Sequence, residues 1–157
     1  SVTGFSFSSF LNLVRLGVPE DDITTILMAD HGLQLYGNAV IANTDFAKSN
    51  PDIVKKFLSA VGSGWKDAIK SPKTAAAALV KRNPAADAAL EQRRLQLAIN
   101  ANVLTDYVKA NGMGGIDRDR FAVAIKQLGE TYDYKTAPDA KLYFTGAYLP
   151  DGGILLQ

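Results

Sequence analysis

Three helix starts lie close together in residues 44–84, TDFAKSNPDIVKKFLSAVGSGWKDAIKSPKTAAAALVKRNP, and each is marked by a polar residue followed by proline. They are Asn50-Pro51, Ser71-Pro72 and Asn83-Pro84. Asn and Ser can accept hydrogen bonds from the free amides of a first helical turn. Proline fits just inside that turn because its missing N–H would have had no partner there. The pattern predicts helices over 51–70 and 72–81, and a third from 84 to about 100.

The helix expected over 51–70 is amphipathic. Its apolar residues recur at three- and four-residue spacing, which places them on one face: Ile53, Val54, Phe57, Leu58, Val61, Trp65, Ala68 and Ile69. We therefore assign Trp65 to core packing and not to ligand stacking.

Two apolar runs outside this stretch have the character of strands. Residues 23–29, ITTILMA, are β-branched or apolar throughout, and 39–43 repeat that character. Such runs are typical of a parallel sheet covered on both faces. Further helices are expected near 8–16, 103–110 and 118–128, the last capped by Asp117. The fold class predicted is α/β, with a helix-rich carboxy-terminal portion.

Composition excludes several classes of protein. The chain has 157 residues, is 47% hydrophobic and 21% charged, and carries a formal net charge of +1. It is long enough for one ordinary globular domain, and it has no overall positive field that would attract nucleic acid. The absence of cysteine excludes disulfides, thiolate metal sites and cysteine nucleophiles.

The loop at residues 4–9, GFSFSS, is the first candidate binding element. Ser6 and Ser8 offer hydroxyls and amides at the start of an expected helix, where anions and polar groups can bind. The alternative is an ordinary serine-capped helix with the neighbouring phenylalanines in the core.

Asp30, Tyr36 and Asn38 form the second candidate, between the two expected strands. A pyrimidine or isoalloxazine-like ring would use an aromatic face together with carboxylate and amide hydrogen-bonding partners. The alternative is that Asp30 and Asn38 satisfy turn backbone groups while Tyr36 packs against the sheet. His31 is the single histidine, so we expect no zinc site and predict no catalytic residue and no cofactor.

The chain resembles a known family in this order of motifs. Tyr36-Gly37-Asn38, the run through Asn43 and the whole of 44–84 resemble the second half of the NMT1/THI5-like solute-binding proteins. These are extracytoplasmic receptors of ABC importers for nitrate, sulfonates, taurine, thiamine-precursor pyrimidines and riboflavin-like compounds. Residues 4–32 resemble the family's segment before the return crossover, and 143–150, YFTGAYLP, resemble its final helix.

The resemblance implies part of a bilobal periplasmic-binding-protein type II fold. Residues 1–35 would end the second lobe, 36–43 would be the return hinge crossover strand, and 44–157 would be the carboxy-terminal part of the first lobe. The amino-terminal half of a family member, with its signal peptide, is expected to be absent.

The implied function is capture of a small heteroaromatic or anionic solute for an ABC transporter permease, without catalysis. A heteroaromatic solute is favoured because Tyr36, Asp30 and Asn38 suit a ring better than an oxyanion. The alternative is a thiamine-pyrimidine synthase-like enzyme, a branch that uses histidine and iron. The resemblance implies a periplasmic or extracytoplasmic location, and leaves open a membrane anchor in the missing amino terminus. An isolated fragment of this kind is expected to self-associate.

Overall fold

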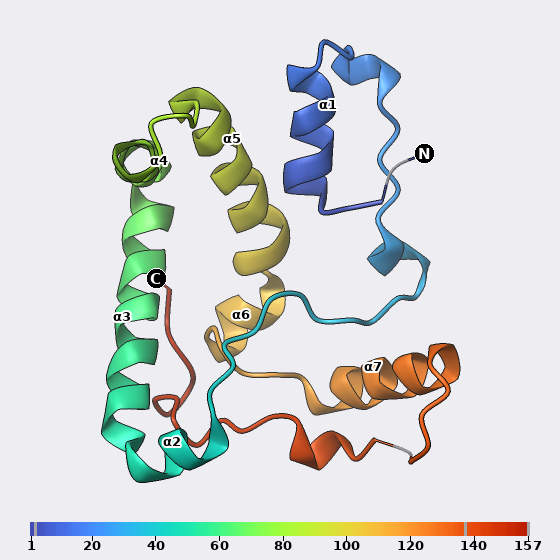
Figure 1. Cartoon of the computed structure of the whole chain (residues 1–157), viewed down its shortest axis with the longest axis vertical. Coiled ribbons are helices and arrows are strands. Elements are labelled where there is room, and N and C mark those ends of the chain that lie inside the picture. Colours follow the sequence, from blue (N-terminus) through green and yellow to red (C-terminus); the bar gives the residue numbers. More distant parts are fainter. Residues whose placement is uncertain (2, 137, 157) are drawn as a thin grey trace.

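The computed structural model describes residues 1, 3–136 and 138–156, and most of their regular structure is helical (Figure 1). The α-helices are α1 (Leu11–Arg15), α2 (Thr44–Ser49), α3 (Pro51–Lys70), α4 (Pro72–Arg82), α5 (Ala88–Ala98), α6 (Asp106–Asn111) and α7 (Arg118–Thr131). Shorter elements are the π-helical turns Ser6–Phe10 and Ile99–Val103 and the 3₁₀ turns Glu20–Asp22, Met28–His31 and Ala140–Leu142.

Two of the three expected proline starts are confirmed, because α3 begins at Pro51 and α4 at Pro72. The preceding polar side chains do not cap these helices. The Asn50 amide donates to the carbonyl of Phe46 at 3.1 Å, and the Ser71 hydroxyl lies 2.8 Å from that of Thr74. The fixed φ of proline, more than a side-chain cap, therefore marks these two starts.

The third proline start is wrong. Helix α5 begins at Ala88, where the Asp87 carboxylate accepts a hydrogen bond from the amide of Leu90 at 2.7 Å. Residues 84–86 form a turn, in which the Asn83 side chain accepts from the amide of Ala85. A capping carboxylate downstream of the proline supplies the acceptor that the helix start needs.

The other helix predictions hold with shifted ends. Helix α7 begins at Arg118, and Asp117 caps it by accepting from the amide of Arg120 at 2.9 Å. Helix α6 begins later than expected because Thr105 caps it. The expected helix over 8–16 is formed by a π-helical turn followed by α1.

The predicted parallel sheet is wrong for the residues that the structure describes. These residues contain no strand, and their one β-bridge is antiparallel, between Met113 and Ile154. The two apolar runs, 23–29 and 39–43, are largely exposed to solvent: Ile26 is 71% exposed and Ile41 is 91% exposed. A strand needs a neighbour for its backbone hydrogen bonds, and composition predicts an extended backbone without supplying that neighbour. The helix-rich part of the fold-class prediction is confirmed.

The second apolar run also ends in a helix cap. The Asn43 side chain accepts hydrogen bonds from the amides of Asp45 and Phe46, each at 3.0 Å, and so starts α2. The residues expected to form a return hinge crossover strand, 36–43, thus lead directly into a short helix (Figure 1).

Packing centres on α5, which contacts α4 and the Ser6–Phe10 turn, while α3 contacts both α2 and α4. The core is small, and its buried apolar residues are Leu11, Ala47, Ala76, Ile99, Ala124, Ile154 and Leu156. Trp65 is only half-buried and Phe57 is 54% exposed, so the apolar face of α3 is partly covered.

The carboxy-terminal tail returns to α6 and α3 (Figure 1). Met113 and Ile154 exchange backbone hydrogen bonds of 2.8 and 2.9 Å. Gly112 and Gly153 both have positive φ, and a Cβ on either would strike the backbone of the opposite segment. Beyond this crossing, Ile154 packs against Gly62 of α3.

Candidate functional site

The two serine candidates occupy different surroundings. Ser6 lines a hollow of about 200 Å³ between the Ser6–Phe10 turn and the end of α5, together with Phe10, Thr25, Leu97 and Ala101. The Ser8 hydroxyl donates to the carbonyl of Phe5 at 3.3 Å, a local contact that is not a helix cap, because a capping serine accepts from a first-turn amide. Ser6 is therefore the serine with access to a cavity.

Asp30 and Asn38 lie exposed on the surface. Asp30 is in the 3₁₀ turn Met28–His31, as is the exposed His31, and Asn38 is in the extended run after Tyr36. Among the described residues, no hydrogen bond or ion pair engages the side chain of Asp30 or Asn38. Both side chains retain their full capacity to bind a polar ligand group.

Tyr36 packs on the amino-terminal end of α7. Its hydroxyl accepts from the amide of Asp117 at 2.9 Å, and its ring meets Phe121 edge to face with centroids 6.1 Å apart. The Arg120 guanidinium carbon lies 4.7 Å from the centroid of the Tyr36 ring. One face of the tyrosine is thus already occupied by a cation, and the surface it packs on is a helix, not a sheet.

Residues 32–36 are held along α7 by side chains of that helix. Arg120 donates to the carbonyls of Gln34 and Leu35 at 3.2 and 3.1 Å. Gln127 accepts from the amide of Gln34 at 2.9 Å and donates to the carbonyl of Gly32 at 2.8 Å. These contacts were not predicted from the sequence. Their signal was weak: an arginine and a glutamine two helical turns apart, on one face of a predicted helix.

Tyr107 of α6 borders the same cluster. Burial raises the pKa of the Tyr107 phenol, and the nearby Tyr36 and Asp117 raise it further, while Arg118 acts in the opposite direction. The phenol therefore stays protonated at neutral pH and can donate a hydrogen bond.

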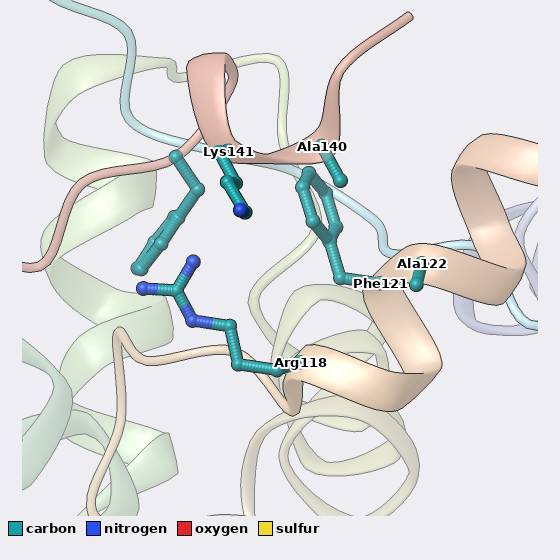
Figure 2. A pocket seen from close by; sticks show the side chains of 6 residues that line it. Arg118, Phe121, Ala122, Ala140 and Lys141 are labelled. Atoms are coloured by element: carbon teal, nitrogen blue, oxygen red, sulfur yellow. The ribbon is translucent and has the colours of Figure 1, made fainter.

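A larger hollow, of about 580 Å³, lies between α7 and the Ala140–Leu142 turn (Figure 2). Phe121 lines it and also touches Tyr36, so this hollow adjoins the Tyr36 cluster. None of the five residues predicted for ligand binding is among its lining residues.

Within the part of the chain that the structure describes, no hydrogen bond or ion pair joins the five predicted residues to one another. Ser6 borders one hollow, Tyr36 is part of the α7 cluster, and the others are free at the surface or bonded locally. Their common role in ligand binding stays a prediction. Within the described residues, no group of three His, Cys, Asp or Glu side chains could hold a metal ion.

The smaller hollow is lined by an aromatic ring, aliphatic side chains and two hydroxyls, the mixture of apolar surface and few polar groups that small-molecule sites share. The family comparison gives the more particular assignment. Residues 4–75 match the family model described as NMT1/THI5 like, so this segment of the chain is similar to that family. The predicted resemblance is confirmed there, and all five predicted ligand residues fall inside the matched segment.

No curated protein and no solved structure matches the chain. Among the described residues, no helix is both long enough and apolar enough to cross a membrane.

Proposed function

We propose that this chain is part of the extracytoplasmic solute-binding component of an ABC importer. The observation that carries the proposal is the family match over 4–75, because that segment contains every residue predicted to bind ligand. The proposed fold is the bilobal periplasmic-binding type, in which two lobes close on a solute and present it to a membrane permease. The proposed location is the periplasm or another extracytoplasmic space.

The proposed solute is a small heteroaromatic or anionic compound. Asp30 and Asn38 supply a carboxylate and an amide that are free to read ring nitrogens, and Ser6 supplies a hydroxyl beside a hollow. Tyr36 would offer only the ring face that Arg120 leaves open. This combination favours a heteroaromatic ring, with pyrimidine and riboflavin-like compounds ahead of taurine, sulfonates and nitrate.

A thermal-shift screen of the chain tests this proposal. The compounds are hydroxymethylpyrimidine, riboflavin, taurine, an alkyl sulfonate and nitrate. A ligand that binds the folded state stabilises it by about 2.7 kcal/mol at a hundred times its dissociation constant. We expect one compound to raise the melting temperature, and the shift to shrink in Asp30→Asn and Ser6→Ala.

The matched control is Asp21→Asn, which removes a carboxylate from another exposed turn of the family segment. This variant should keep the full shift. If no compound shifts the melting temperature, or if Asp30→Asn and Asp21→Asn respond alike, the proposed solute site is wrong.

The alternative is a thiamine-pyrimidine synthase-like enzyme, which the family's description also covers. That chemistry would use histidine and iron, and this sequence has one histidine and no cysteine, which offers few of the ligands that iron favours. Iron-dependent turnover of a pyridoxal phosphate donor would establish the enzyme in place of the receptor.

A further inference from the structure

The hollow between α7 and the Ala140–Leu142 turn combines two aromatic rings with two cations. Its lining residues are Arg118, Phe121, Ala122, Ala140, Lys141 and Phe144. Figure 2 shows the guanidinium of Arg118 and the ammonium of Lys141 directed into the space beside the ring of Phe121. No acidic side chain is among the described residues that line the hollow.

Both cations are available to a ligand. The Arg118 guanidinium carbon lies 5.8 Å from the centroid of the Phe144 ring, which holds it over an aromatic face. Neither Arg118 nor Lys141 forms an ion pair with another described residue. An anion entering the hollow would therefore gain charge-assisted hydrogen bonds without displacing a carboxylate.

We propose that this hollow is a binding site for a flat aromatic anion, such as an aromatic carboxylate. Phe121 and Phe144 provide the apolar surface for a ring, and Arg118 offers a planar fork that matches the two oxygens of a carboxylate. The volume of about 580 Å³ is in the usual range of small-molecule pockets, roughly 300 to 1,000 Å³.

This site is separate from the proposed transport function. Its lining residues all lie outside the family-matched segment 4–75, and none is a residue predicted to hold the transported solute. Either proposal can therefore fail while the other stands.

Calorimetric titration of the whole chain tests the site with three matched probes. They are 2-naphthoate, its neutral amide 2-naphthamide, and cyclohexanecarboxylate, which keeps the charge but lacks the aromatic ring. We expect 2-naphthoate to bind about tenfold or more tightly than either analogue, because each analogue loses one of the two kinds of contact.

Four variants locate the binding. Arg118→Gln and Lys141→Gln should each weaken 2-naphthoate about tenfold, since each removes a cation from the hollow. Lys126→Gln removes a cation that pairs with Glu130 on the same helix, and should leave the affinity unchanged. Ala122→Leu should block the ring without changing any charge, so it tests the same cavity by a steric route.

Circular dichroism first establishes that each variant is folded. The binding data then either support the site or overturn it. Weakening by Arg118→Gln, Lys141→Gln and Ala122→Leu, with no effect of Lys126→Gln, would support the site. No binding of 2-naphthoate, equal binding of the acid and the amide, or insensitivity to all three hollow variants would overturn it.

Discussion

Gly62 and Gly64 are two residues apart in α3 and have different surroundings. A Cβ at Gly62 would clash with Cγ2 of Ile154 from the carboxy-terminal tail, whereas a Cβ at Gly64 meets nothing within 4 Å. Ile154 is β-branched and held by the bridge to Met113, so it cannot easily turn away.

This difference predicts opposite effects of the same substitution. Gly64→Ala should stabilise the fold by about 0.5–1 kcal/mol through helix propensity. Gly62→Ala should destabilise it relative to Gly64→Ala by about 1–3 kcal/mol, because the extra methyl overpacks the contact with Ile154. Urea unfolding of both variants measures the difference, and equal stabilities would show that the tail does not pack on α3.

Glu20 and Arg93 form a contact that the sequence did not predict. The Arg93 guanidinium donates to both carboxylate oxygens of Glu20 at 2.7 and 2.6 Å, and so ties the Glu20–Asp22 turn to α5. The hydrogen bond from Arg93 holds the pKa of the Glu20 carboxyl below its ordinary range.

A lowered pKa in the folded state predicts the direction of the pH effect. The stabilisation by Glu20 is present above its unfolded pKa of about 4.3, and is lost as the pH falls through the lowered folded value. As the pH drops through this range, the stability of Glu20→Gln should therefore fall less steeply than that of the wild type. Near pH 7, the slope of stability against pH should be the same in both proteins. Denaturation midpoints measured from pH 7 to pH 3 check this, and an unaltered acid profile would argue against the contact in solution.

At the scale of elements, the segment 32–36 depends on α7. Arg120 contacts it through two backbone carbonyls and the Tyr36 ring, and Gln127 contacts it through a carbonyl and an amide. Side chains of α7, and not a strand ladder, therefore hold the segment 32–36, which leads into the predicted crossover 36–43.

Arg120→Lys tests this attachment, because it keeps the charge and loses the planar fork. We expect backbone amides in 32–36 to exchange with solvent about tenfold faster, equivalent to about 1.4 kcal/mol of lost protection. Lys126→Gln, on the same helix, should leave the exchange unchanged. Unaltered exchange in Arg120→Lys would mean that Arg120 does not hold the segment.

Sequence reasoning succeeded where the determinants were local. Pro51, Pro72 and Asp117 act within one helical turn, and each marks a helix start in the structure. The prediction of a sheet was wrong because strand pairing depends on distant segments, which apolar composition does not identify. The hollow was missed for the same reason, since Arg118 and Lys141 come together only through the fold.

At the scale of the whole molecule, the chain exposes an unusually large surface. Its accessible area is 11561 Å², whereas a compact monomer of this length exposes about 7,700 Å². Part of the excess is apolar, in the runs that contain Ile26 and Ile41. Apolar extended segments with free backbone groups favour pairing between chains.

We therefore expect the purified chain to self-associate as its concentration rises. The double variant Ile26→Lys with Ile41→Lys should shift the association to higher concentration, because charge opposes strand pairing. Leu16→Lys changes an exposed leucine at the end of α1 and serves as the control. Light scattering during size-exclusion chromatography measures the mass; a monodisperse monomer that melts cooperatively at every concentration would refute the expectation.

The most direct test of solute capture by this family segment is to recover the ligand after binding. The chain is saturated with the compound that gives the largest thermal shift, freed of excess compound, denatured, and the released compound is identified by mass spectrometry. The receptor hypothesis predicts the original compound, chemically unchanged and in a fixed ratio to protein, with less retained by Asp30→Asn. Release of a modified compound, or no retention at all, would contradict it.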